Sequence, residues 1–196
     1  HGYAASLLGD NTARAQGRLT LNPAAHIDPF GTVVMPALLI LLNAGILFGY
    51  AKPVPVDARN LRHPRRDMIW VALAGPGMNI VLALAAALLL PLATWLPAAV
   101  GPWTAANLDN TVKISLLLAV FNMLPIPPLD GGRVLAGLLP PRQAMALARI
   151  EPFGIFIVLG LFILLPILSQ GRLDLFGTLI LQPTQMMYNA FLGIFG

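Results

Sequence analysis

The sequence predicts an all-α membrane protein that crosses the bilayer more than once, and two observations carry this prediction. First, 57% of the 196 residues are hydrophobic and only 10% are charged, whereas a soluble domain has roughly 25% charged residues. So few charged side chains cannot cover a surface that faces water. Second, the apolar residues are collected in long runs without any charge, a pattern typical of membrane-spanning helices.

Five apolar runs are candidates for helices, and we expect about four to five transmembrane or interfacial helices in total. One crossing needs about 20 residues. The third run is shorter than that, and the fifth is interrupted by two glutamines and a proline, so it fits either a final span or an interfacial hairpin. The runs cover residues 33–51, 68–90, 114–129, 152–171 and 175–196. After residue 90, three prolines predict a turn-rich or interfacial segment.

Charge indicates the orientation of these helices. The loop 51–67 carries five Lys or Arg residues against two Asp residues, and cytoplasmic loops are enriched in Lys and Arg, so we expect it to be cytoplasmic. Residues 131–151 contain three arginines and should lie on the same side, which places Asp130 near the cytoplasmic end of its helix. The same bias explains the net charge of +4 without a nucleic-acid partner. Cysteine is absent, which excludes disulfides and thiolate sites.

A short β-hairpin is predicted near residues 17–30. Residues 18–21 alternate weakly in polarity, and Gly17 and the pair Asn22-Pro23 bound them. Such a strand would either pair with an unwound peptide by β-augmentation or simply cover a site, and the sequence favours neither. If residues 33–51 cross fully, the hairpin and His1 lie opposite the basic loop. His1 then lies close to Asp130 only if it is well inside the bilayer or if residues 33–51 do not span fully. The remaining intervals are short, so we expect residues 1–196 to form a single membrane domain.

Asp130 is the most informative residue. It follows a long apolar run and the prolines at positions 125, 127 and 128, which deny the backbone a continuous helix. A carboxylate at the edge of hydrocarbon is costly and is therefore a functional candidate, often as an ion ligand. Gly131 and Gly132 permit sharp turning and close approach of other backbones. The alternative role, in which Asp130 caps a helix beginning at Gly131, is about as well supported by these residues alone.

A longer pattern around Asp130 resembles the N-x-x-P-x-x-P-L-D-G-G motif of the site-2 proteases, the intramembrane zinc metalloproteases. Residues 1–10 resemble the stretch that starts at the second histidine of that family's H-E-x-x-H helix, and residues 74–79 resemble its A-G-P-x-x-N segment. Residues 17–31 also read like its compact members. The motif is carried by Asn122, Pro125, Pro128, Leu129, Asp130, Gly131 and Gly132.

The resemblance implies a role for each of these positions. His1 and Asp130 would be ligands of Zn²⁺, and Asn122, Pro125, Pro128, Gly131 and Gly132 would shape the site. Asn79 would hydrogen-bond the substrate backbone or the developing oxyanion, although an interhelical hydrogen bond is the alternative for an amide near Gly75 and Gly77. No H-E-x-x-H is present, so we expect a sequence truncated at its N-terminus. The first histidine and the general base Glu would lie upstream, and the chain as given would be inactive.

The remaining titratable candidates have simpler explanations. We expect His26 to be tied to its own loop, His63 to be solvated among arginines, and Glu151 to mark a helix entry. The predicted function is therefore that of an intramembrane zinc metalloendopeptidase of a prokaryotic inner membrane, acting on membrane-anchored proteins within the lipid bilayer. A non-catalytic membrane scaffold, or a transporter with Asp130 and Asn79 in an ion path, is the alternative. The sequence does not predict the oligomeric state.

Overall fold

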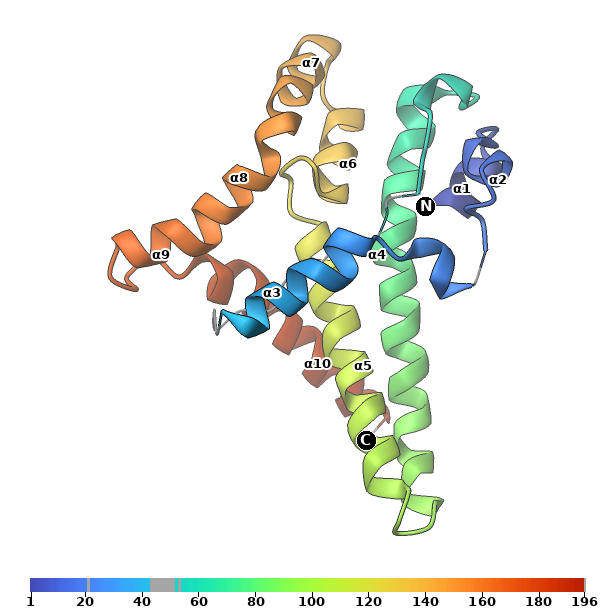
Figure 1. Ribbon diagram of the computed structural model, residues 1–196, viewed down its shortest axis with the longest axis vertical. Helices are drawn as coiled ribbons and strands as arrows, with labels where there is room; N and C mark the ends of the chain where they lie inside the picture. The colour runs from blue at the N-terminus through green and yellow to red at the C-terminus, as the bar shows by residue number, and fades with distance from the viewer. Residues whose placement is uncertain (21, 43–51, 53, 196) are drawn as a thin grey trace. The chain divides into compact units, whose positions relative to one another are not determined.

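The computed structural model describes residues 1–20, 22–42, 52 and 54–195. The chain divides into two compact units, His1–Val71 and Ala72–Gly196. Every regular element within the described ranges is helical, so the predicted all-α class is confirmed (Figure 1). That these elements form a single membrane domain stays a prediction.

The first unit is built from short helices around a small core. Ala5, Leu61 and Val71 are buried together at its centre, and Leu8 and Met68 pack against them. The elements in chain order are α1 (Gly2–Leu7), α2 (Thr12–Ala15), the 3-10 turn η1 (Pro23–His26), the π-helical turn η2 (Pro29–Val34), α3 (Met35–Leu41), the 3-10 turn η3 (Ala58–Asn60) and the beginning of α4 (Pro64–Leu89).

The hairpin predicted near residues 17–30 is wrong for the described part of that stretch. Residues 18–20 have no regular structure, and helical turns begin at Pro23 and Pro29. The Asn22 side chain accepts a 3.1 Å hydrogen bond from the N–H of Ala24, and Asp28 accepts one of 2.7 Å from Gly31. Each capping residue precedes a proline, whose fixed φ suits the first helical position. Two strong helix starts therefore outweigh a weak alternation.

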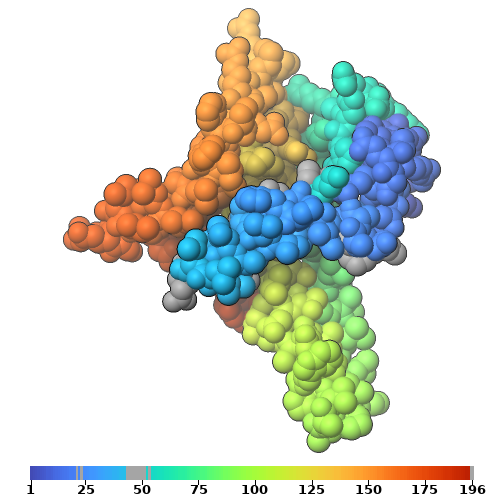
Figure 2. All heavy atoms as spheres, viewed as in Figure 1, coloured from blue at the N-terminus to red at the C-terminus, as the bar shows by residue number. Residues whose placement is uncertain are grey.

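The first predicted crossing is described only in part. Residues 29–41 form one apolar helical segment, while residues 43–51 of that run, and residues 51 and 53 of the basic loop, lie outside the described residues. Val33, Leu38, Ile40 and Leu41 are exposed, and Figure 2 shows this blue-to-cyan segment at the surface. An exposed apolar face of this kind is what contact with lipid requires.

The second unit holds the longer helices. It contains the rest of α4 and a series of helices connected by short turns (Figure 1). In chain order these are the 3-10 segment η4 (Leu90–Trp95), α5 (Gly101–Asn122), α6 (Asp130–Leu138), α7 (Pro141–Ile150), η5 (Glu151–Phe153), α8 (Gly154–Leu159), the π-helical η6 (Gly160–Leu164), α9 (Leu165–Leu168), the π-helical η7 (Gly177–Leu181) and α10 (Gln182–Phe195).

Small side chains bring α4 and α5 together. Ala83, Ala86 and Ala87 of α4 are buried against Val112 and Leu116 of α5. Alanine allows two helix backbones to approach closely, which is the usual basis of helix association in lipid. Side chains of α10 complete this core from a third direction, namely Met187, Tyr188 and Phe191.

Within the described residues, two helical segments are long and apolar enough to cross a membrane. They are Pro64–Trp95 and Pro141–Leu168, and they contain most of the predicted runs 68–90 and 152–171. Residues 175–195 form one continuous helical segment, so the alternative of an interfacial hairpin is wrong for them. The predicted total of four to five membrane helices stays a prediction.

Helix α5 begins 13 residues before the predicted run 114–129, because two charges inside it are satisfied. The Lys113 ammonium lies 2.6 Å from the Asp109 carboxylate one turn earlier. The Tyr188 hydroxyl of α10 donates a 2.5 Å hydrogen bond to the same carboxylate, and Lys113 lies 5.2 Å from the centre of the Tyr188 ring. These contacts connect α10 to α5 through a neutralised ion pair.

We expect Tyr188→Phe to lower the free energy of unfolding by about 1.5 kcal/mol, because it removes a hydrogen bond to a charged acceptor. Phenylalanine keeps the ring beside Lys113, so the packing changes little. Chemical unfolding followed by circular dichroism checks this value. Tyr3→Phe is the matched control, because the Tyr3 side chain is 65% exposed, and it should change stability by less than about 0.5 kcal/mol. Equal effects of the two variants would contradict the prediction.

Candidate metal centre

His1 is held by its imidazole at the start of α1. The ring Nδ1 lies 2.7 Å from the carbonyl oxygen of Val71 in α4. A carbonyl can only accept a hydrogen bond, so we infer that Nδ1 carries the proton and that Nε2 carries the lone pair. Histidines that bind metals have this arrangement almost without exception, with the second nitrogen donating to a carbonyl or carboxylate.

Tight packing fixes the beginning of α1. Gly2 is buried, and a Cβ atom at this position would lie 2.8 Å from Cγ1 of Val54 and 3.4 Å from Cβ of Ala13. At the other end of the helix, the Leu8 carbonyl accepts a 3.1 Å hydrogen bond from the N–H of Arg62. The helix that carries His1 is therefore held at both ends by the segment before α4.

Asp130 follows an interruption between two helices. Helix α5 ends at Asn122, residues 123–129 form turns, and α6 begins at Asp130. The peptide bond between Pro127 and Pro128 is cis. Leu129 occupies the N-cap position, so Asp130 lies in the first turn of α6 and does not cap a helix that starts at Gly131. Negative charge is favoured there by the helix dipole, and the side chain is half-buried.

The glycines after Asp130 let the interrupted segment fold onto α6. A Cβ atom on Gly131 would lie 2.2 Å from the Met123 carbonyl oxygen, and one on Gly132 would lie 2.5 Å from the nitrogen of Pro127. The close approach predicted for these glycines is confirmed. The sharp turning is not, because both have helical conformation within α6 and no positive φ. Gly154 of α8 makes an even closer contact, since its Cβ atom would lie 1.9 Å from the Pro127 carbonyl oxygen.

Asn79 lies in α4, three residues after Pro76, and is half-buried. Within the described ranges the Asn79 side chain has no hydrogen-bond partner. The structure of these residues therefore does not support the alternative role of Asn79 in an interhelical hydrogen bond. The structure thus describes His1 in the first unit and both Asn79 and Asp130 in the second. No group of three or more His, Cys, Asp or Glu side chains that could hold a metal is found in the described part of the chain.

The other titratable candidates lie where the sequence predicts them. The His26 Nε2 is 3.0 Å from the carbonyl oxygen of Thr20, so the interpretation that His26 is tied to its loop is confirmed. His63 is 75% exposed and lies 3.9 Å from Asp67. Glu151 starts the turn η5 at a helix entry and lies 3.9 Å from Arg133.

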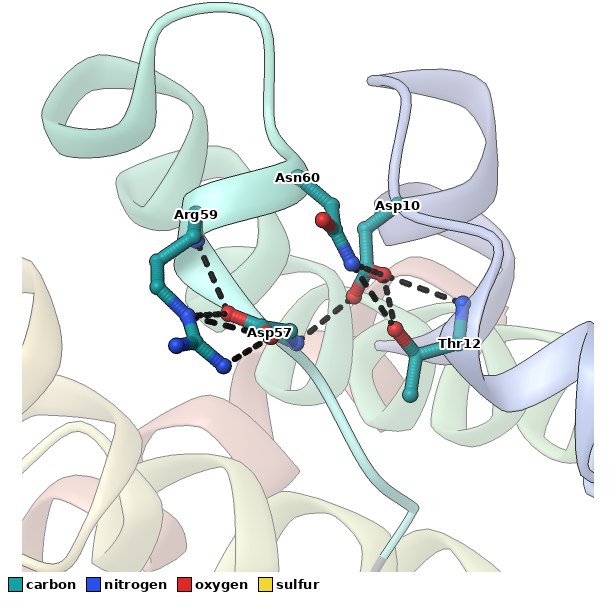
Figure 3. A network of polar contacts seen from close by, with 5 residues as sticks. All are labelled: Asp10, Thr12, Asp57, Arg59 and Asn60. Carbon is teal, nitrogen blue, oxygen red and sulfur yellow. Dashed lines mark hydrogen bonds and ion pairs between the residues drawn. The ribbon is translucent and has the colours of Figure 1, made fainter.

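Sequence reasoning missed Asp10, which is fully buried. Figure 3 shows its carboxylate at the centre of a polar network. Oδ1 accepts hydrogen bonds from the backbone N–H and the hydroxyl of Thr12 and from Nδ2 of Asn60, while Oδ2 accepts a 2.8 Å bond from the N–H of Asp57. The local signals are Asp-x-Thr, a common side-chain turn, and the position of Asp10 at the end of the family-like stretch 1–10. The partners from residues 57–60 cannot be inferred from spacing.

Both carboxylates of this network are held in their charged form. Burial raises the pKa of Asp10, but the hydrogen bonds from Thr12, Asp57 and Asn60 outweigh burial and bring this pKa below its ordinary value. The side-chain hydrogen bond from Arg59, aided by its backbone N–H, lowers the pKa of Asp57 to about 2. The two carboxylates therefore stabilise the folded form as anions.

We expect acid to destabilise the first unit. A carboxylate whose pKa is lower in the folded than in the unfolded chain, where Asp has a pKa of about 3.9, stabilises the fold fully above that pH and loses this contribution as pH falls through the folded value. For Asp57 the loss falls between about pH 4 and about pH 2. Unfolding midpoints of the wild type and Asp57→Asn across this range check the prediction. The variant should show a weaker pH dependence, and identical curves would contradict it.

Comparison with known proteins identifies the family of this chain. The sequence model of the family described as "Peptidase family M50" matches residues 98–165. "Putative zinc metalloprotease YwhC" of Bacillus subtilis is 39% identical over 183 residues, which cover 88% of this chain and 80% of the relative. "Putative zinc metalloprotease Rip2" of Mycolicibacterium smegmatis and that of Mycobacterium tuberculosis are each 34% identical, and the chain spans 60% of their length. No solved structure matches the chain.

The protein is of the helical class, and some of its helices are long enough to cross a membrane. The chain before Asp130 is interrupted between two of its helices. The chain belongs to peptidase family M50, the membrane-embedded site-2 proteases. The resemblance inferred from residues 122–132 is thereby confirmed.

Proposed function

We propose that this chain is the membrane-embedded part of a zinc metalloendopeptidase that hydrolyses peptide bonds in or near transmembrane segments. The observation that carries the proposal is Asp130 at the start of α6, behind a helix interruption that packs directly on the backbone of Gly131 and Gly132. A carboxylate held on a rigid segment between two apolar helices suits a metal ligand better than a mobile surface charge.

The residues present fit zinc in their chemistry. Imidazole nitrogen and carboxylate oxygen are both accepted ligands of Zn²⁺. The hydrogen bond from His1 Nδ1 to Val71 assigns the lone pair to Nε2, the nitrogen that would bind the metal, and Asp130 adds a carboxylate. When bound, zinc would lower the pKa of a water molecule and polarise the scissile carbonyl. The proposal also requires a further histidine and a glutamate general base, which the H-E-x-x-H motif of this family supplies.

Asn79 contributes to substrate binding in this proposal. Its amide can donate to a carbonyl oxygen of an unwound peptide, or to the oxygen on which negative charge develops during the reaction.

The surroundings of α4 support a membrane orientation. This helix has 26 residues, which at 1.5 Å per residue gives about 39 Å, enough to cross a hydrocarbon layer of about 30 Å. Trp70 near its beginning and Trp95 after its end are exposed, and tryptophan is enriched at membrane interfaces. Arg62, Arg65 and Arg66 precede the helix or lie in its first turn. We infer a multi-pass protein of a prokaryotic inner membrane with these arginines in the cytoplasm.

The substrates in this proposal are membrane-anchored proteins, and the bilayer is the second partner. The test uses the full-length gene product, purified and reconstituted in lipid vesicles with a membrane-spanning test substrate. We expect about one zinc per chain, cleavage within the bilayer, and loss of cleavage after chelation that added zinc restores. A protein that contains no zinc and cleaves nothing would contradict the proposal and favour a scaffold or a transporter.

A further inference from the structure

We propose that Asp10 is a positioning residue for His1, because its buried carboxylate fixes the short helix α1 against the segment 56–62. The inference rests on the proposed function, in which His1 binds zinc. It adds a residue that lies outside the motifs around Asp130 and Asn79, and that would act on the metal only through the placement of α1.

The first step is the number of hydrogen bonds that meet at Asp10. The side chain is fully buried, and four donors converge on its two oxygens. Two of them come from Thr12, at the beginning of α2, and the other two come from Asp57 and Asn60, close to 50 residues further along the chain (Figure 3). Asp10 therefore joins the end of the α1 segment to a distant part of the first unit.

The second step is the connection from Asp10 to α1. The N–H of Asp10 donates a 2.9 Å hydrogen bond to the carbonyl of Ala5, which closes the end of the helix. Gly9 has a φ of +115° between the two, a conformation that L side chains rarely adopt. A Cβ atom there would also lie 3.1 Å from the Asn60 carbonyl oxygen. The backbone that follows α1 therefore has a defined conformation. This conformation places the Asp10 carboxylate against residues 57–60.

The third step is that α1 depends on these contacts for its position. It has six residues, which is less than two turns, and helices this short are not stable alone in water. Its two ends are held separately, the first by the His1 hydrogen bond to Val71 and the second by Asp10 and the bond from Arg62 to Leu8. Because a helix this short moves as one piece, release of the second end would leave the imidazole positioned by the contacts of the first end alone.

The network also requires a carboxylate at position 10, because an amide cannot accept all of its hydrogen bonds. An asparagine side chain has one acceptor oxygen and one NH₂ group. Whichever way the amide introduced by Asp10→Asn is turned, its NH₂ group faces an N–H donor, either that of Asp57 or those of Thr12 and Asn60. The substitution is therefore nearly isosteric and yet breaks at least one of the contacts that hold the end of α1.

The test compares full-length wild type, Asp10→Asn and the control Asp57→Asn. The Asp57 carboxylate binds Arg59 and caps η3, a role that asparagine also fills well, and its N–H to Asp10 is unchanged. Zinc affinity is measured by competition with a chelator. The tautomer of His1 is measured by ¹⁵N NMR of the metal-free protein above about pH 8, where an ordinary imidazole is neutral.

We expect Asp10→Asn to lower zinc affinity by about 10- to 100-fold, the range found when residues that orient metal ligands are replaced. The His1 spectrum should change from one tautomer to a mixture, and Asp57→Asn should match the wild type in both measurements. A folded Asp10→Asn protein with wild-type affinity and a single tautomer would overturn the inference, because a purely structural role leaves both unchanged.

Two further outcomes stay decisive. If Asp10→Asn does not fold, Asn60→Ala removes one part-buried hydrogen bond to Asp10 and one exposed hydrogen bond to Thr12. It should still lower zinc affinity several-fold, so an unchanged affinity would overturn the inference. If the wild type binds no zinc, the proposed function fails by itself. The His1 tautomer in the Asp10→Asn protein then still decides whether Asp10 positions the imidazole.

Discussion

Replacement of Asp130 by alanine should remove bound zinc and peptidase activity from the full-length protein. The variant loses one ligand of the proposed metal, and we expect zinc affinity to fall by at least about 100-fold, since even indirect partners of a ligand contribute 10- to 100-fold. Cleavage of a membrane-spanning substrate should fall to background. Metal analysis of the purified variant and a cleavage assay in lipid vesicles measure the two effects.

Asp174→Ala is the matched control for this variant. Asp174 is also an acidic residue near the start of a helical segment, and its carboxylate accepts a 2.7 Å hydrogen bond from the N–H of Gly177. This change should lower stability slightly, by about 1 kcal/mol for a lost cap, and leave zinc content unchanged. Retention of zinc by Asp130→Ala would show that Asp130 is not a ligand, even if activity were lost.

Gly154→Ala should lower the free energy of unfolding by about 3 kcal/mol. The added methyl would lie 1.9 Å from the carbonyl oxygen of Pro127 and 2.5 Å from Cδ of Pro128, so α8 or the interrupted segment must move. Overpacking of this kind costs about 1–3 kcal/mol, and the upper end applies because the obstacle is largely backbone. Zinc affinity should fall as well, since Pro127 lies three residues before Asp130.

Gly160→Ala is the control, because it lies in the same apolar helical segment and its Cβ atom would meet nothing within 4 Å. Alanine stabilises a helix relative to glycine by about 0.5–1 kcal/mol, so this variant should be neutral or more stable. Chemical unfolding of both variants in the same detergent gives the comparison. Similar stabilities for the two would contradict the proposed contact between α8 and Pro127.

The fold was predictable where hydropathy alone decides the structure. Two of the long uncharged runs correspond to the helical segments Pro64–Trp95 and Pro141–Leu168, because burial of an apolar helix in lipid depends little on the rest of the chain. The start of α5 was not predictable in this way. Asp109 and Lys113 are tolerated there through contact with Tyr188, a residue that no local pattern connects with them.

In the candidate site too, features set by local sequence were predictable and features set by distant contacts were not. Asp130 could be proposed as a site residue from the sequence because it stands in a contiguous motif, whose glycines approach the backbone of residues 123–127. Asp10 could not, because two of its four donors come from Asp57 and Asn60. The predicted hairpin failed for a third reason, since two side-chain caps at Asn22 and Asp28 are stronger local signals than alternation over four residues.

The tryptophans are intrinsic fluorescence probes of how deeply the helix ends lie in the bilayer. The chain has only three, and Trp70, Trp95 and Trp103 are all exposed near the ends of α4 and α5. The intrinsic tryptophan fluorescence of residues 1–196 therefore originates from these helix ends. Lipids brominated at successive positions along the acyl chain would quench this emission according to depth, so single tryptophan-to-phenylalanine variants would locate each helix end in the bilayer without any attached dye.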